Sequence, residues 1–321
     1  MWGPGCYQAS EDYLAWLYAA ERSPAPRGDD FLLARAGGAI VGCIHKMRLL
    51  WTDGRESAEV ASLHNWVVDE RYRTGVGLVL LTKAMRSEKH AFISSALGDL
   101  ATVYRKLKCQ ELHPAWYRDV LRPVRGAAHL AIHKASGRAP RSGLQHRFER
   151  AAKRASALGL RMTLQPTERE IEETVRSLAA AAGNAWRPAW TVDSFRWRFF
   201  HARGPRHVYM REASGDLALF TISIQRGLVV ARLIEACFTG GDGTSRFIRS
   251  CRSSLKRMGV DVLLGYSAHP PMRAVLQRMG WSPRLDGQPS FLHHARSQGP
   301  FSPVAFNGSA ADFGFETIGA R

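Results

Sequence analysis

The chain has no apolar run that approaches the roughly 18 residues needed to cross a bilayer. Its first residues, MWGPGCYQASEDY, lack the basic and apolar regions of a signal peptide. Its five cysteines include no Cys-x-x-Cys pair and no Cys/His spacing of the kind that binds metal. These absences predict a cytoplasmic protein with reduced thiols, no membrane span and no metal site.

What the chain does contain is a large excess of positive charge. Hydrophobic residues make up 45% and charged residues 23% of its 321 residues, which predicts a folded chain long enough for two domains. The formal net charge is +17, and the basic segment 122–161 holds a single acid, Glu149. Basic surfaces attract nucleic acid, acidic lipid or acidic proteins. A solvated linker explains the segment equally well, because it has few aromatic side chains to stack on bases.

An internal repeat divides the chain into two similar copies. DYLAWLY begins at Asp12 and DSFRWRF at Asp193, with Asp, Trp and an aromatic residue at the same relative positions. Each motif precedes a predicted hairpin with a glycine turn, a further apolar strand, a helix, a short strand and a second helix. The second copy has an additional strand and helix before its motif, and Thr167 with Glu170 forms a capping box there.

The repeat also gives the expected domain boundaries. We expect a first domain at 1–140, a basic linker or helix at 141–160, a second domain at 161–294 and a loop-rich tail at 295–321, with a late strand pair within the tail. Each domain would have a normal size of roughly 140 residues. The element order predicts an α+β fold for both.

The most informative short segment, ERYRTGVGLVLL at residues 70–81, follows an apolar strand and begins a helix. Gly75 and Gly77 would let backbone N–H groups approach an anion, and the helix N-terminus adds a favourable dipole. Arg71 and Arg73 would supply charge-assisted contacts to a phosphate. The same spacing also fits an ordinary tight strand-to-helix connection that binds nothing.

This order of elements, with VVDERYRTGVGLVLL at its third strand and helix, resembles the GNAT superfamily of acyl-CoA-dependent N-acyltransferases. In that family the amides of a Q/R-x-x-G-x-G/A turn bind the cofactor pyrophosphate, and the turn here is one residue shorter. The resemblance implies two tandem GNAT-like α+β domains, each with a mixed, mostly antiparallel sheet flanked by helices. It also implies that acetyl-CoA or another acyl-CoA binds at Val67, Val68, Arg71, Arg73, Thr74, Gly75, Val76, Gly77 and Leu78.

A second block, residues 101–109, resembles the family's later helix, in which a tyrosine precedes a Lys-Leu pair. The resemblance makes Tyr104 the expected donor of a proton to the departing CoA thiolate. A tyrosine that only packs at a helix edge would fit the same position. Gly98 stands where the family often has asparagine.

For the base that accepts a proton from the amine, the sequence offers His64 and, less directly, Glu59. The ordinary pKa of histidine, near 6.5, lets it accept a proton at neutral pH. A single histidine on a strand fits a structural role as well. Cys109 is conceivable as an acyl-carrying nucleophile, but the sequence places nothing basic beside it as an activator.

Other prominent residues carry no expected chemistry. The duplicated Trp16 and Trp197 indicate packing shared by the two copies, and His293 with His294 is expected at the surface. The second copy has CFTGGDGTSRF at its strand end, with Asp242 and no arginine pair. We therefore expect this copy to bind no CoA and to complete the acceptor cleft.

The expected activity is transfer of an acetyl or longer acyl group from acyl-CoA to a primary amine of a small metabolite, amino sugar or peptide. Two alternatives stay open. The chain also resembles the Fem-type aminoacyltransferases, tandem GNAT folds that use aminoacyl-tRNA, and its charge of +17 would suit tRNA or an acidic acyl carrier protein. It could instead be a catalytically inactive GNAT-like binding module.

Overall fold

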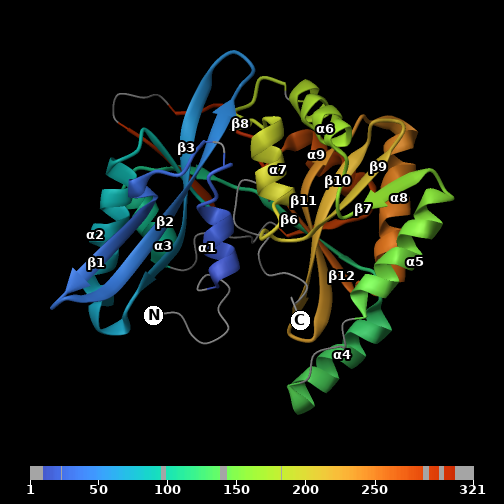
Figure 1. Ribbon diagram of the computed structural model, residues 1–321, viewed down its shortest axis with the longest axis horizontal. Coiled ribbons are helices and arrows are strands. Elements are labelled where there is room, and N and C mark those ends of the chain that lie inside the picture. The colour runs from blue at the N-terminus through green and yellow to red at the C-terminus, as the bar shows by residue number, and fades with distance from the viewer. Residues whose placement is uncertain are drawn as a thin grey trace.

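The computed structural model describes residues 10–22, 24–94, 99–137, 143–181, 183–284, 289–295 and 300–307. Within these residues the strands form two seven-stranded sheets, and helices pack against both of them (Figure 1). The expectation of an α+β fold with two mixed sheets flanked by helices is confirmed. Gly98 and residues 308–321, which include most of the expected late strand pair, lie outside the described part.

The first sheet holds the candidate turn at the end of its third strand. Its spatial order is β1 (Phe31–Ala36), β2 (Ala39–Thr52), β3 (Ser57–Val68), β4 (His90–Ile93), β14 (Ser290–His294) and β5 (Gln110–Leu112), with β8 (Arg187–Pro188) paired to β2. Among the described pairings of this sheet, β3 with β4 is parallel and the others are antiparallel.

The second sheet repeats this pattern. Its order is β13 (Ser282–Arg284), β6 (Ala115–Val120), β12 (Val262–Ser267), β11 (Leu228–Cys237), β10 (Leu217–Gln225), β9 (His207–Glu212) and β7 (Leu160–Thr163). Here the parallel pair among the described strands is β11 with β12. Both parallel pairs join the third main strand after a tryptophan motif to the strand that follows the next long helix, as the repeat predicts.

The helices are α1 (Glu11–Leu17), α2 (Arg73–Arg86), α3 (Asp99–Lys106), α4 (Pro123–Ser136), α5 (Leu144–Ser156), α6 (Glu168–Ala180), α7 (Val192–Phe200), α8 (Gly241–Met258) and α9 (Pro270–Arg278). The predicted capping box is present, because Thr167 and Glu170 each accept the other's backbone N–H at the start of α6. Helix α5, within the expected linker, buries Ala151 and Ala155 in the core of the second sheet. None of the described helices is long and apolar enough to cross a membrane.

The two sheets exchange strands. β6 comes from the first copy but lies between β12 and β13, while β14 comes from the second copy but lies between β4 and β5. Each sheet therefore contains strands from both sides of the expected boundaries at 140 and 161. The expectation that His294 lies at the surface is wrong, because β14 places it half-buried, with its Nδ1 2.9 Å from Nδ1 of His90.

The two tryptophan motifs meet at the contact between the copies. Trp16 Nε1 donates to the carbonyl oxygen of Trp197 at 3.1 Å, and Trp197 Nε1 donates to that of Trp16 at 2.7 Å. The two rings stack with centroids 5.3 Å apart. Such reciprocal contacts are typical of an interface between two related surfaces. The expected packing role is confirmed, and the partner of each tryptophan is the other one.

Candidate functional site

β3 and β4 separate at the end of their parallel pair. They pair from Ala61 with Ala91 to Leu63 with Ile93, where β4 ends, whereas β3 continues to Val68. Within the described residues, the edge of β3 that faces away from β2 has no β4 partner over this final stretch. An unpaired strand edge presents backbone groups that can bind an extended ligand arm. The predicted arm-binding residues Val67 and Val68 lie at this edge.

A β-bulge bends β3 at the same place. One residue separates Cys43 from His45 on β2, but two residues, Asn65 and Trp66, separate their partners on β3. Asn65 has a positive φ of +51°, a conformation that asparagine adopts more readily than most residues. Bulges redirect side chains and are frequent beside active sites. The pattern of apolar residues does not reveal this bulge, and Asn65 is its one signal in the sequence.

The turn after β3 presents the start of α2. Asp69 accepts the backbone N–H of Arg71 and so begins the short 3-10 helix Glu70–Tyr72. α2 then starts at Arg73, where Tyr72 provides no side-chain cap, and no acidic residue lies in its first turn. Arg73 donates its backbone N–H to the carbonyl oxygen of Glu70, so this first amide is already engaged. Helix starts leave further amides without intrahelical acceptors, and a start with no side-chain cap and no acid in its first turn suits an anion there.

The two glycines of the turn serve different purposes. Gly75 has φ of +97°, and a Cβ added there would meet nothing within 4 Å. Any side chain at Gly75 would therefore strain the backbone without a steric clash. At Gly77 an added Cβ would lie 3.2 Å from Cζ2 of Trp66, so this glycine lets α2 approach the bulged strand closely.

The two arginines of the turn are solvent-exposed. Arg71 donates from Nε and Nη2 to the two carboxylate oxygens of Asp69 at 3.1 and 3.2 Å, whereas Arg73 Nη1 lies 3.8 Å from Glu70, and the two arginine side chains are 80% and 68% exposed. Exposed pairs of this kind contribute little to stability, so both guanidinium groups can turn toward a phosphate. Leu78 is exposed on the following turn of α2, while Val76 packs against the core beneath it.

Tyr104 lies in the core below α2. It is 2% exposed, and its ring centroid is 5.1 Å from that of Phe291 on the exchanged strand β14. It shares one hydrophobic cluster with the partly buried Trp66, Val68 and Val76 of the candidate site. Burial raises the pKa of Tyr104 above its ordinary value, so its hydroxyl is protonated at neutral pH but is a weaker acid than that of an exposed tyrosine.

The two predicted bases have different surroundings. Burial, followed by the nearby His45, Arg198 and Arg22, lowers the pKa of His64 well below 6.5. His64 is therefore neutral at pH 7 but accepts a proton weakly. Glu59 is held by two cations, with Arg27 at 2.8 Å and Arg48 at 3.3 Å.

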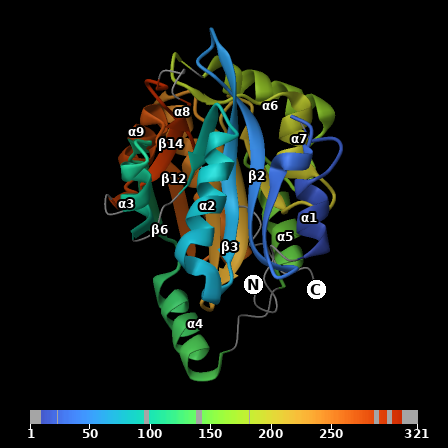
Figure 2. The same ribbon diagram turned by 90° about the vertical axis from the view of Figure 1, so that its left-hand side faces the viewer.

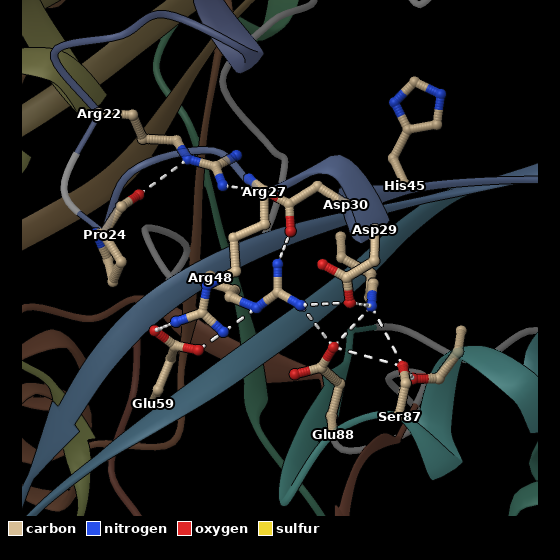
Figure 3. Close-up of polar contacts among 12 residues, drawn as sticks. Arg22, Pro24, Arg27, Asp29, Asp30, His45, Arg48, Glu59, Ser87 and Glu88 are labelled. Atoms are coloured by element: carbon tan, nitrogen blue, oxygen red, sulfur yellow. Dashed lines mark hydrogen bonds and ion pairs between the residues drawn. The ribbon is translucent and has the colours of Figure 1, made fainter.

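The partners of Glu59 belong to an ionic network along β2 (Figure 3). Lys46 and Arg48 are both buried, and each contacts the two carboxylates Asp29 and Glu88 at distances from 2.6 to 3.0 Å. Arg48 also contacts the buried Asp30. Because each of these charges faces an opposite charge, the network offers no unpaired catalytic carboxylate among its members, and loss of one partner would leave a buried charge uncompensated.

In the second copy a carboxylate already occupies the corresponding turn. Asp216 is fully buried and accepts the N–H of Thr239 at 2.7 Å and the hydroxyl of Thr244 at 2.9 Å, where α8 begins. A fixed negative charge at a helix N-terminus disfavours a phosphate in the same position. Sequence reasoning named Asp242, which is exposed, and missed Asp216 because it lies before β10, far away in the chain.

The described part of the tail also covers the gap between β11 and β12 of the second copy. Ala268 donates its N–H to the carbonyl oxygen of Phe306 at 2.8 Å, and Ser267 donates its hydroxyl to Asn307 at 2.8 Å. Asn307 in turn donates to Glu235 of β11. Asn307 thus bridges β11 and β12 beyond the end of their parallel pair, at the position that stays open beside β3 in the first copy.

No protein-family model and no curated protein sequence matches the chain. Solved structures do match it. Saccharomyces cerevisiae N-myristoyltransferase with bound myristoyl-CoA aligns with a TM-score of 0.57 and 11% identity, over 96% of this chain and 76% of that one. A GCN5-related N-acetyltransferase from Kribbella flavida aligns with a TM-score of 0.51 and 12% identity, over 84% and 60%. These likenesses show that the chain has the fold of N-acyltransferases of the GNAT type.

Proposed function

We propose that the protein transfers an acyl group from acyl-CoA to a primary amine at a site beside the end of β3. The observation that carries this proposal is the uncapped start of α2 with Gly75 at φ +97°, next to the unpaired edge of β3. The fold is shared with an N-myristoyltransferase whose structure contains myristoyl-CoA, and this supports acyl-CoA as the donor. The acceptor would be the amine of a small metabolite, amino sugar or peptide.

In this proposal the CoA pyrophosphate binds the first amides of α2, and Arg71 and Arg73 contribute charge. The pantetheine arm pairs with the backbone of Val67 and Val68. The residues that complete the site are Thr74, Gly75, Val76, Gly77 and Leu78.

The chemistry needs a neutral amine and a proton for the departing thiolate. The amine attacks the thioester carbonyl, the carbon–sulfur bond breaks, and the thiolate takes a proton from Tyr104. His64 is too weak a base to deprotonate an ammonium group by itself, because its surroundings depress its pKa. We therefore assign the loss of the amine proton to water and leave His64 as a neutral neighbour of the bulge.

The second copy would bind no CoA and would form one side of the acceptor site. Its support is the buried carboxylate of Asp216 at the start of α8 and the tail residue Asn307 between β11 and β12. Together they fill the two places where the first copy would bind pyrophosphate and pantetheine. One CoA should therefore bind per chain.

The test compares two glycine variants that carry the same backbone strain. Gly54 has φ of +89° in the turn between β2 and β3, at the other end of β3 from the candidate site. Gly75→Ala should weaken CoA binding by about tenfold or more, because the amides at the start of α2 move. Gly54→Ala should bind CoA like the parent. Isothermal titration with CoA gives affinity and stoichiometry, and an unchanged affinity in Gly75→Ala or two equivalent sites in the parent would refute the assignment.

A further inference from the structure

Helix α4 has its polar and apolar faces reversed relative to an ordinary surface helix. Its polar side chains face the protein: His129 Nδ1 lies 2.7 Å from the buried Asp261, and Arg125 Nε donates to His129 Nε2 at 3.2 Å. His133 also lies against the protein, because a Cβ added at Gly227 would be 2.5 Å from its Cβ. Surface helices normally bury the apolar face and expose the polar one.

The outer face of α4 is apolar. Val124 is 85% exposed, Ile132 53% and Leu130 38%. Alanines fill most of the remaining outer positions, namely Ala127, Ala128, Ala131 and Ala135. Of the exposed residues of α4, which the structure describes in full, Lys134 alone has a charged side chain. Figures 1 and 2 show the ribbon of α4 projecting below the two sheets and the helices that cover them.

Guanidinium groups gather at the start of this helix. A Cβ added at Gly259 would be 2.5 Å from Nη1 of Arg147 and 3.6 Å from Nη1 of Arg122, so both guanidinium groups lie beside Gly259. Partial burial and then the charges of Arg125 and Arg147 lower the pKa of Arg122. The neighbouring Asp261 acts in the opposite direction on the pKa of Arg122, and its Oδ2 is engaged by His129 and by the N–H of Val229. Adjacent guanidinium groups without a dedicated carboxylate suit a phosphate.

Positive charge continues from this point onto the neighbouring helices. α5 packs beside α8 in the core of the second copy. The exposed basic residues of α5 are Arg150, Lys153 and Arg154, with one exposed acid, Glu149, and Lys256 and Arg257 are exposed at the end of α8 beside Gly259. Exposed positive charge therefore predominates on the parts of α5 and α8 that adjoin Arg147 and Gly259.

We propose that α4, with Arg122 and Arg147 at its start, binds the surface of an anionic phospholipid membrane. Such a surface presents phosphates directly above hydrocarbon, and α4 begins beside the two guanidinium groups near Gly259, with Val124, its most exposed large apolar residue, two positions after Arg122 in the chain. This inference concerns a surface at the N-terminal ends of β11 and β12, apart from the proposed acyl-CoA site, and does not depend on it.

The alternatives fit the same observations less well. A nucleic acid backbone would use the arginines but would leave Val124, Leu130 and Ile132 in water. A second copy of the chain docked through α4 would bring two clusters of like charge together. An acidic protein could use both features, and the experiment below separates it from a membrane.

The experiment is flotation of the intact protein with two kinds of vesicle. Vesicles of phosphatidylcholine and phosphatidylglycerol in equal amounts should bind the protein, and added salt should weaken the binding. The affinity of the protein for vesicles of phosphatidylcholine alone should be lower by about tenfold or more. Absence of binding to the mixed vesicles would overturn the proposal, whether the protein binds acidic proteins or not.

Three variants test the surface itself. Val124→Glu with Ile132→Glu, and separately Arg122→Gln with Arg147→Gln, should each reduce vesicle binding by about tenfold or more. Ile40→Glu, at a residue that is 48% exposed on the first sheet, should bind like the parent. Melting curves check that each variant is folded. If the variant with two glutamates still binds vesicles, and duplex RNA binds the parent but not the Arg122→Gln/Arg147→Gln variant, the ligand of this surface is a polyanion and the membrane proposal is wrong.

If gel filtration shows that the parent is a dimer and the variant with two glutamates is not, while vesicle binding is unchanged, α4 serves self-association and the membrane proposal is also wrong.

Discussion

At Tyr104, a packing role and a catalytic role make different demands on the side chain. Packing uses the ring, which is 2% exposed against Phe291, whereas proton donation uses the hydroxyl. Tyr104→Phe should therefore lower kcat by about 10²-fold, because a general acid contributes that much. The free energy of unfolding should change by no more than about 1 kcal/mol, because the ring remains. A thiol-detecting turnover assay and denaturant unfolding measure the two effects.

The matched control is Tyr117→Phe. Tyr117 is 1% exposed in the core of the second sheet, far from the candidate site in the fold. Its loss of a hydroxyl should leave kcat unchanged. If Tyr104→Phe and the parent turn over equally fast, this helix shares the fold of the acyltransferases but Tyr104 donates no proton in the reaction.

The sequence could predict those parts of the site whose cooperating residues lie close together in the chain. The turn from Arg71 to Leu78 is contiguous, so its glycines and charges could be read directly. The environment of His64 could not, because the groups that lower its pKa after burial, His45, Arg198 and Arg22, come from both copies. Asp216 was missed for the same reason.

At the scale of elements, the stacked tryptophans of α1 and α7 should be energetically coupled. Trp16→Ala and Trp197→Ala each remove a buried indole and its hydrogen bond, and each should cost about 3–5 kcal/mol of unfolding free energy. The double variant should cost less than the sum by roughly 0.5–3 kcal/mol, since the second change removes a contact already lost. Denaturant unfolding of the four proteins completes the cycle.

A second cycle serves as its control. Trp281 is 3% exposed in the core of the second sheet and does not belong to the cluster that contains Trp16. The costs of Trp16→Ala and Trp281→Ala should therefore add. Additive costs for Trp16 and Trp197 would contradict their coupling through the stacked rings.

The elements of the repeat could be predicted, including the four-residue strand β4, but the strands outside the repeat could not. Periodic apolar residues indicate α2 and α8, a capping box indicates α6, and apolar runs indicate the hairpins of both copies. β5, with three residues, and β14, with five, follow the last helix of a copy and so lie outside the elements that recur. Their places in the sheet depend on pairing with distant strands, and a repeat along the chain says nothing about such an exchange.

At the scale of the molecule, the exchange makes each copy depend on the other. A fragment 1–140 would lack β14 between β4 and β5, and a fragment 141–321 would lack β6 between β12 and β13. Neither fragment should unfold cooperatively alone, because an internal strand and its backbone hydrogen bonds are missing. Circular dichroism during denaturant unfolding tests this.

Co-expression of the two fragments separates loss of a strand from the cost of the chain break itself. The pair should form a complex whose cooperative unfolding resembles that of the intact chain. Cooperative unfolding of fragment 1–140 alone, at the denaturant midpoint of the whole chain, would show that β14 is dispensable for the first sheet.

The exchanged strand β14 also delays completion of the first sheet during translation. The first sheet has all its other main strands once residue 112 has emerged from the ribosome, but β14 begins only at residue 290. At the usual rates of about 5–20 residues per second, β4 and β5 wait on the order of ten to forty seconds for the strand that joins them. Throughout that interval the nascent chain presents unpaired strand edges, which are the surfaces that chaperones bind and that pair with neighbouring chains. Of the strands that the structure describes, the last to leave the ribosome is thus the one that protects the first sheet to be made.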